Sequence, residues 1–487
     1  MTCSELVRRA RAVLGPLSSP FWSQRGRGCR ALVLGSLLAL GACGGGGGGS
    51  SGSGAPSTPT PPVPPAASNY AVGGTVRGLL GTGLALQNNG ADDLEIAADG
   101  SFSFATPLAN GASFDVTVKS QPNVLTRVCT VGNGSGSVAG ADVANIVVTC
   151  AAPPARFAYV VNQSVDSISA FAVDAVSGVL SSLGADVATG NQPVFVAVHP
   201  SGRFAYVANT VSNDVSAYRI DGTTGALSAI GVSNVAAGTA PSTIAVHPTG
   251  AFAYVANSGS NTVSAYAIDP VSGALSEMLG SPFTSGLGAF SATTDPAGRF
   301  LYASNSLANN VTVFAIDAAS GGLTAIAAPK ADTDNLPFSI SLSPNGRFAY
   351  VANQGDDNVT AYTVDAGTGA LSAMAVPPVA AGSIPVSITV DPTGRFAYVA
   401  NSNANTVSAY TIDAVSGALS PMATFPSSGS EPIFVSVDPT GRFAYVVHWQ
   451  SSTVTRFAID AASGALSGPV VYSGALASIP RAIAFSR

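Results

Sequence analysis

One segment of this sequence occurs seven times in nearly the same form. A clear copy, at residues 395–419, reads RFAYVANSNANTVSAYTIDAVSGAL. Its tyrosine recurs at steps of 47 or 48 residues, at Tyr159, Tyr206, Tyr254, Tyr302, Tyr350, Tyr398 and Tyr445. Such a regular period indicates a repeat architecture, in which each unit buries its faces only against its neighbours.

Each repeat contains four short apolar runs separated by turn-forming residues. In residues 385–422 these runs are PVSITV, RFAYVA, TVSAYTI and ALSPM. The first break, Asp391-Pro392-Thr393-Gly394, contains a proline that presets φ and a glycine that accepts positive φ. We therefore expect each repeat to form a four-stranded antiparallel meander.

The apolar runs carry apolar or small residues on both faces, as in Phe396-Ala397-Tyr398-Val399-Ala400. A strand with one exposed face alternates apolar and polar residues, so both faces of each sheet are expected to be covered. A blade wedged between two other blades meets this requirement. The sequence predicts an all-β chain in which residues 156–487 form a seven-bladed β-propeller.

The two ends of the propeller segment indicate how the ring closes. The first repeat begins at Arg156 without a preceding inner-strand run, whereas residues 480–485 match that run and have no RFAYVA after them. We therefore expect residues 480–485 to pair with residues 157–161.

The repeat resembles that of the lactonase-like β-propeller family, which includes 6-phosphogluconolactonase and is known for a Tyr-Val-Thr-Asn string. Here the string reads YVVN at 159, YVAN at 206, 254, 350 and 398, YASN at 302 and YVVH at 445. The resemblance implies the propeller fold and, less specifically, lactone hydrolysis.

The N-terminus has the features of a secretory signal, predicted for residues 1–42. Six arginines lead into a short apolar run that ends in Leu40-Gly41-Ala42-Cys43. About ten apolar residues are too few to span a bilayer as a helix. The site resembles a bacterial lipobox, which implies cleavage before Cys43 and a lipid on its sulfur. The alternative is an ordinary signal with a chance cysteine.

Residues 43–68, rich in Gly, Ser and Pro, are expected to form a tether. With the anchor on Cys43, the chain is predicted to be a membrane-anchored lipoprotein outside the cytoplasm, in the periplasm or at the cell surface. The membrane is then its first partner.

Residues 69–151 lack the repeat and show short β runs with Gly-Asn-Asp turns, so we expect a small β-sandwich domain. It resembles a module that precedes repeats in bacterial surface proteins. If Cys43 is acylated, Cys129 and Cys150 are the remaining pair in an oxidising compartment. We predict a disulfide between them; two unpaired buried thiols are the alternative.

Charge argues against nucleic acid as a partner, because beyond residue 42 the chain holds 14 basic and 25 acidic residues. Residues that recur once per repeat are interpreted as structural, namely the arginine of Gly-Arg-Phe and the aspartate of the IDAVSG-like turn. His199 and His247 occupy the position of Asp391 and are interpreted as turn residues rather than metal ligands. Two loops rich in Asp and Asn, 332–335 and 356–358, match no EF-hand spacing, so no metal or cofactor is predicted.

Function is expected where the repeat is broken around the mouth of the channel. The exceptions to a Ser, Gly, Asn and Thr consensus are Glu431, His448, Trp449 and Arg481, together with Lys330 two blades away. The first four come from three loops that are adjacent in the ring, so we expect them to share one pocket.

Two functions are compatible with these residues. The family resemblance implies hydrolysis of a ring ester, with His448 as general base, Glu431 orienting or activating water and Arg481 stabilising the oxyanion. Family enzymes tend to carry Pro-Arg-His at the entry to an inner strand, but the histidine is missing from every repeat here. We therefore favour a binding or scaffold module for a small-molecule or protein ligand, anchored by Trp449, over a lactonase.

Overall fold

The computed structural model describes residues 68–123, 127–231, 234–326, 331–375, 377–473 and 479–486. Every regular element within these ranges is a β-strand, and there are 43 of them. The prediction of an all-β chain is confirmed. The described part of the chain contains no helix long and apolar enough to cross a bilayer. Cys43 and the tether up to residue 67 lie outside the described residues.

The segment before the propeller forms two four-stranded sheets and one short strand pair. One sheet has the order β5 (Gly100–Ser103), β2 (Val72–Arg77), β10 (Val143–Ala151) and β8 (Val128–Gly132), and the other has the order β4 (Asp92–Ile96), β3 (Leu84–Asn88), β7 (Ser113–Ser120) and β9 (Ser135–Ser137); β1 (Asn69–Tyr70) pairs with β6 (Leu108–Ala109).

Both four-stranded sheets contribute to one hydrophobic core. Val148 of β10 and Leu86 of β3 are fully buried in it. Exposed and buried residues alternate along much of β7, as expected for strands with one face on a core. Cys129 and Cys150 are register partners in β8 and β10 and are joined by a disulfide, so the predicted pairing is confirmed.

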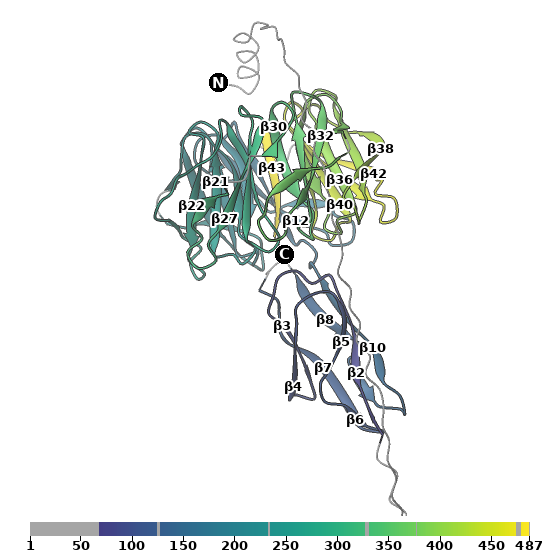
Figure 1. Ribbon diagram of the computed structural model, residues 1–487. Coiled ribbons are helices and arrows are strands. Elements are labelled where there is room, and N and C mark those ends of the chain that lie inside the picture. The colour runs from purple at the N-terminus through teal and green to yellow at the C-terminus, as the bar shows by residue number, and fades with distance from the viewer. Residues whose placement is uncertain are drawn as a thin grey trace, which may run out of the picture. The chain divides into compact units, whose positions relative to one another are not determined.

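The propeller consists of seven blades, each with an inner, a second, a third and an outer strand, in antiparallel order (Figure 1). The inner strands are β15 (Pro193–Val198), β20 (Pro241–Val246), β25 (Ala289–Thr294), β30 (Pro337–Leu342), β35 (Pro385–Val390), β39 (Pro432–Val437) and β43 (Pro480–Ser486). The second strands are β11 (Phe157–Asn162), β16 (Phe204–Asn209), β21 (Phe252–Asn257), β26 (Phe300–Asn305), β31 (Phe348–Asn353), β36 (Phe396–Asn401) and β40 (Phe443–His448).

The third strands are β12 (Ser167–Val173), β17 (Asp214–Ile220), β22 (Thr262–Ile268), β27 (Asn310–Ile316), β32 (Asn358–Val364), β37 (Thr406–Ile412) and β41 (Thr453–Ile459). In the first five blades the outer strand is split into two pieces, β13 (Leu180–Ser182) and β14 (Val187–Ala188), β18 (Leu227–Ala229) and β19 (Val235–Ala236), β23 (Leu275–Glu277) and β24 (Phe283–Thr284), β28 (Leu323–Ala325) and β29 (Ala331–Asp332), and β33 (Leu371–Ala373) and β34 (Val379–Ala380). In the last two blades it is continuous, as β38 (Leu419–Pro426) and β42 (Leu466–Tyr472).

The inner strands show that the ring is closed. Each packs against the next along the chain, and β43 packs against both β39 and β15. β43 also pairs with β11, so blade 1 combines the two ends of the propeller segment. The predicted pairing of residues 480–485 with residues 157–161 is confirmed, and with it the seven-bladed propeller.

The second strand of each blade is the most deeply buried element. All six of its residues are buried in every blade, because neighbouring blades cover both of its faces. Its tyrosine hydroxyl donates to a glycine carbonyl of the following blade, 2.7–3.0 Å away in all seven cases. The recurring tyrosine of the sequence is thus an inter-blade contact.

The glycine of each IDAVSG-like turn is required by this packing. Gly417 has φ of 75°, and a Cβ atom at this residue would lie 2.3 Å from the ring of Phe348 in the preceding blade. The arginine of Gly-Arg-Phe serves the same junction: Arg347 donates to the carbonyl of Val415 at 3.1 Å and lies over the Phe348 ring. The structural interpretation of this arginine is confirmed.

Candidate functional site

The loops before the inner strands and the loops after the second strands lie at one end of the blades, here called the entry face. Backbone hydrogen bonds join the two sets of loops within a blade. In blade 7 the amide of Trp449 donates to the carbonyl of Glu431 at 2.9 Å, and in blade 6 the amide of Ser402 donates to the carbonyl of Ile384 at 2.8 Å. The same contact in blade 1 joins Gln163 to Ile479.

A second set of contacts joins the entry-face loops of adjacent blades. The side chains of Asp166, Asn213, Asn261, Asn309, Asp357, Asn405 and Ser452 accept hydrogen bonds from the amides of Gln192, Ala240, Gly288, Leu336, Ile384, Glu431 and Ile479, respectively. The residue at each of these positions has positive φ. Positive φ is costly for a β-branched residue such as Ile384, and strained backbone of this kind concentrates at functional sites. The entry face is therefore a strained ring held in place by side-chain hydrogen bonds.

Glu431 and Trp449 lie in the entry-face loops of blade 7. The amide of Glu431 is fixed by Asn405 Oδ1 at 2.7 Å and its carbonyl by the amide of Trp449. Both side chains are partly exposed. The indole Nε1 of Trp449 is enclosed and has no hydrogen-bond partner among the described residues. An unpaired buried donor costs about 1–3 kcal/mol.

Arg481 enters from the neighbouring blade. It is the second residue of β43, the inner strand that packs against β39 of blade 7. The amide of Ile479, two residues earlier, donates to Ser452 Oγ of blade 7 at 3.3 Å. The structure thus places Glu431, Trp449 and Arg481 at the same end of two adjacent blades. Lys330, the fifth predicted site residue, lies outside the described residues.

His448 is not at the entry face, although it precedes Trp449. Its side chain has no exposed surface, Nε2 contacts the carbonyl oxygen of Ser427 at 2.9 Å, and Nδ1 contacts Thr453 Oγ1 at 3.3 Å. Burial lowers its pKa from 6.5 to about 4. With both ring nitrogens engaged and no accessible surface, the side chain cannot reach a substrate. The structure gives His448 a packing role in place of the predicted role as general base or ligand contact.

The repeat itself explains the burial of His448. The last residue of the second strand is asparagine in the other six blades and is fully buried there as well. Asn401, for example, donates through Nδ2 to Thr406 Oγ1 at 3.1 Å and to Ser408 Oγ at 2.9 Å. Aligning His448 with the asparagine of the YVAN string would have revealed this position from sequence. In blade 7, Thr455 Oγ1 occupies the position of Ser408 Oγ and has no partner among the described residues.

Aromatic side chains of the inner strands contact one another between blades, a feature that sequence reasoning missed. The rings of Phe195 and Phe434 make an edge-to-face contact with centroids 5.8 Å apart, although blade 1 separates their blades. Phe290 and Phe338 of adjacent inner strands lie 4.0 Å apart. The third residue of the inner strand is Ser or Thr in blades 3 to 6, whereas blades 7, 1 and 2 carry Phe434, Ala482 and Phe195 there. Glu431, Trp449 and Arg481 belong to the same apolar sector.

Comparison with known protein families identifies the family of this propeller. The family model described as "Lactonase, 7-bladed beta-propeller" matches residues 116–236, 229–384 and 373–472, well over half of the chain. The chain belongs to the lactonase seven-bladed β-propeller family. No curated protein matches it.

Solved structures agree with this fold. The periplasmic gluconolactonase of Pseudomonas aeruginosa has 21% identity over 68% of this chain and 99% of its own, with a TM-score of 0.59. A candidate 6-phosphogluconolactonase of Bacteroides uniformis has 19% identity over 68% of this chain and 100% of its own, with a TM-score of 0.59. A Lactobacillus plantarum protein has 21% identity over 69% of this chain and 100% of its own, with a TM-score of 0.58. At these identities the likeness shows the fold alone.

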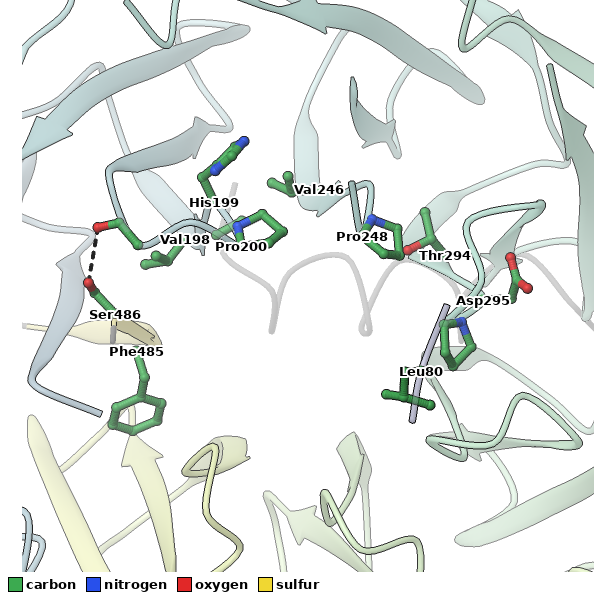
Figure 2. Close-up of a pocket in the computed structure, with 13 residues that line it drawn as sticks. Leu80, Val198, His199, Pro200, Val246, Pro248, Thr294, Asp295, Phe485 and Ser486 are labelled. Carbon is green, nitrogen blue, oxygen red and sulfur yellow. Dashed lines mark hydrogen bonds between the residues drawn. The ribbon is translucent and has the colours of Figure 1, made fainter. Parts of the chain in front are cut away.

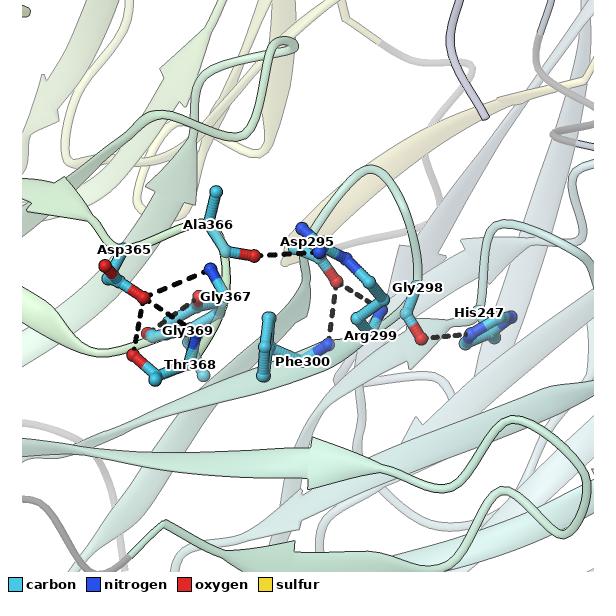
Figure 3. A network of polar contacts seen from close by, with 11 residues as sticks. His247, Asp295, Gly298, Arg299, Phe300, Asp365, Ala366, Gly367, Thr368 and Gly369 are labelled. Atoms are coloured by element: carbon cyan, nitrogen blue, oxygen red, sulfur yellow. Dashed lines mark hydrogen bonds and ion pairs between the residues drawn. The ribbon is translucent and has the colours of Figure 1, made fainter. Parts of the chain in front are cut away.

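The opposite end of this lactonase-family propeller, here called the turn face, carries the turns after the inner and third strands. The Nε2 atom of His247 contacts the carbonyl oxygen of Gly298 at 2.7 Å, and the buried carboxylate of Asp295 accepts from the amides of Arg299 and Phe300 (Figure 3). His199 contacts the Gly250 carbonyl oxygen at 2.9 Å in the same manner. The interpretation of His199 and His247 as turn residues is confirmed.

The aspartates of the IDAVSG-like turns are also structural. Asp365 Oδ1 accepts hydrogen bonds from the amides of Gly367 and Thr368 and from the Thr368 hydroxyl (Figure 3). The hydroxyl and backbone bonds from Thr368 lower the pKa of this carboxyl. The equivalent residues in the other blades bind their turns in the same way, with seven cases in all.

The two loops rich in Asp and Asn hydrogen-bond to each other. Asn335 donates to both carboxylate oxygens of Asp356 at 2.9 Å, and Asn358 donates to Asp334 at 2.6 Å. The described residues contain no group of three or more His, Cys, Asp or Glu side chains arranged to hold a metal ion.

Proposed function

We propose that the entry face binds a small organic ligand at the sector formed by Glu431, Trp449 and Arg481, and does so without chemical turnover. One observation carries the choice of binding over catalysis. All three histidines of the chain, His199, His247 and His448, are buried and engaged in hydrogen bonds. General base catalysis at neutral pH relies most often on an accessible imidazole, and this propeller offers none.

The chemistry of the sector favours a sugar acid or sugar lactone as the ligand class. An indole face packs against the C–H groups of a sugar chain or lactone ring, and a carboxylate accepts hydrogen bonds from sugar hydroxyls. A guanidinium binds a carboxylate or polarises a lactone carbonyl. Glu431, Trp449 and Arg481 supply one group of each kind. The name of the Pseudomonas aeruginosa neighbour, a gluconolactonase, points to the same ligand class.

Lactone hydrolysis is the second candidate function, favoured by membership of the lactonase family. In this mechanism the Glu431 carboxylate takes a proton from water as the water oxygen attacks the lactone carbonyl. Arg481 faces the resulting oxyanion, and the ring C–O bond then breaks. The proton passes from Glu431 to the departing ring oxygen, which becomes a hydroxyl.

Binding and hydrolysis of glucono-1,5-lactone and gluconate separate the two functions. Binding is measured by calorimetry with gluconate and turnover by titration of released acid from the lactone. Trp449→Ser introduces the residue that blades 3, 4 and 6 carry at this position, so it preserves the repeat. Gln354→Ser in blade 5 is the matched control outside the sector.

The binding proposal predicts that Trp449→Ser weakens gluconate binding at least tenfold, that Gln354→Ser does not, and that the lactone hydrolyses no faster with protein than without. Lactone turnover by the wild-type protein that is lost in Glu431→Gln would overturn it in favour of the lactonase. A Trp449→Ser protein that binds gluconate as tightly as wild type would show that Trp449 is not part of a gluconate site.

We further propose that the protein is a cell-envelope lipoprotein held in the membrane through a lipid on Cys43. The support is the order of residues in the sequence: six arginines, a short apolar run, Gly41-Ala42-Cys43 and a Gly/Ser/Pro-rich segment. In such a position the propeller meets extracytoplasmic solutes.

A further inference from the structure

The turn face of the channel has an apolar mouth that repeats around the ring. The turn after the inner strand contains a proline in six blades, namely Pro200, Pro248, Pro296, Pro344, Pro392 and Pro439. Within the mouth, Val198 and Val246 end two of the inner strands, and Phe485 is the last but one residue of β43; all three line a pocket together with Pro200 and Pro248 (Figure 2). A mouth of this composition is unfavourable in water unless something covers it.

A segment of the same chain is suited to cover it. The loop between β2 and β3 reads Gly78-Leu79-Leu80-Gly81-Thr82-Gly83. Leu79 packs against the core of its own domain, whereas Leu80 is not part of that core. Leu80 instead lines the pocket of Figure 2 and a second, neighbouring pocket beside Phe434 and Ile483. Residues Ala66–Arg487 form one compact unit, which contains both the loop and the mouth.

A polar contact accompanies this apolar one. Arg127, next to β8, donates through one guanidinium nitrogen to the carbonyl oxygen of Cys150 at 3.4 Å and through another to that of Pro392 at 3.2 Å. Pro392 is one of the six mouth prolines. Proline carbonyls in these turns are available acceptors, and a guanidinium fits them in a fixed geometry. Leu80 and Arg127 therefore present an apolar and a hydrogen-bonding group to the same rim.

We propose that the loop 78–83, here called the stopper, closes the turn-face mouth. In this arrangement Leu80 fills the apolar part of the mouth, and Arg127 holds the loop in place through its hydrogen bond to the carbonyl oxygen of Pro392. Glycines at both ends of the loop allow the close approach of backbone that a plug needs. The stopper leaves the entry face as the route by which a ligand reaches the channel. It also couples the N-terminal domain to the propeller independently of what the entry face binds.

The test compares two leucine variants of the full chain. Leu80→Asp places a charge in the apolar mouth, whereas Leu279→Asp changes a leucine of blade 3 that is fully exposed and serves as the matched control. Amide hydrogen exchange is followed at Gly202 and Gly250, whose amides bond within the mouth turns. Binding of an apolar fluorescent dye reports exposure of the mouth.

In Leu80→Asp, amide exchange at Gly202 and Gly250 is expected to become about tenfold faster, because exposing one leucine side chain to water costs about that factor in the opening equilibrium. Dye fluorescence is expected to increase. Leu279→Asp is expected to change neither. Arg127→Ala should act in the same direction with a smaller effect. If Leu80→Asp lowers the yield of folded protein, Leu80→Ala with Arg127→Ala provides the same measurement. Unchanged exchange and dye binding in the Leu80 and Arg127 variants overturn the proposal, and neither readout depends on the ligand-binding proposal.

Discussion

The hydroxyl of Tyr445 donates a hydrogen bond to the carbonyl oxygen of Gly178 at 2.7 Å, across 267 residues of sequence. This contact joins blade 7 to the part of blade 1 that comes from the start of the propeller. It repeats the tyrosine-to-glycine bond of the other six junctions, so the last junction is built in the same way as the rest.

Removal of the Tyr445 hydroxyl should weaken the closed ring. Tyr445→Phe leaves the buried carbonyl of Gly178 without its partner, which costs about 1–3 kcal/mol of the free energy of unfolding. Urea unfolding measures the change, and Tyr302→Phe at an internal junction is the control. A Tyr445→Phe protein as stable as wild type would show that this bond contributes nothing to closure.

Loss of the C-terminal strand should have a larger effect. Truncation after Ser478 removes β43 and exposes the edge of β11, which is buried along its whole length in the intact ring. An unpaired edge of this kind promotes aggregation. We expect a lower melting temperature and oligomers in size-exclusion chromatography. A truncated protein that melts like the intact chain and stays monomeric would contradict the role of β43 in closure.

The burial of His448 predicts a pH dependence of stability. Its pKa falls from 6.5 in the unfolded chain to about 4 in the folded protein. The folded state therefore binds fewer protons than the unfolded state. The contribution of neutral His448 to the free energy of unfolding is fully present above pH 6.5 and is lost as pH falls toward 4. The slope reaches at most about 1.4 kcal/mol per pH unit.

His448→Asn isolates this contribution. Asparagine is the residue of the other six blades, and its Nδ2 would reach Thr453 and give Thr455 Oγ1 the partner that it lacks. We expect the His448→Asn protein to have a free energy of unfolding near that of wild type at pH 7.5 and to lose less of it between pH 6.5 and 4. His199 and His247 are present in both proteins, so the difference between the two pH profiles reports His448. His448→Ala, by contrast, should be destabilised at every pH by about 1–3 kcal/mol because Ser427 and Thr453 lose their partner. An identical pH profile for wild type and His448→Asn would show that His448 does not titrate as described.

The anchor proposal predicts a mass and a location. Wild-type protein should carry acyl chains on Cys43 and remain with the membrane fraction, whereas Cys43→Ser should be released into the soluble extracytoplasmic fraction without them. Intact-mass measurement and fractionation test both statements. A wild-type protein without acyl mass would end the lipoprotein proposal.

The sequence by itself determined the propeller. The period of 47 or 48 residues, the four apolar runs and the missing first inner strand were sufficient to predict seven blades and the pairing of residues 480–485 with residues 157–161. They were sufficient because units with nearly the same sequence adopt the same local structure. The C-terminal inner strand can then pair only with blade 1, the one blade without an inner strand ahead of it in the sequence. The once-per-repeat rule also identified the arginines, aspartates, His199 and His247 as structural.

Only the tertiary structure decided which irregular residues reach the entry face. Glu431 and Trp449 are neighbours through a backbone hydrogen bond, yet His448, adjacent to Trp449 in sequence, is fully buried. His448 is the last residue of β40, a strand that neighbouring blades cover on both faces, whereas Trp449 is the first residue of the loop that follows it. The contact of Phe195 with Phe434 and the approach of Leu80 to the turn face arise from residues far apart in the chain. No local pattern encodes such contacts, because they depend on the ring closing and on how the folded units pack.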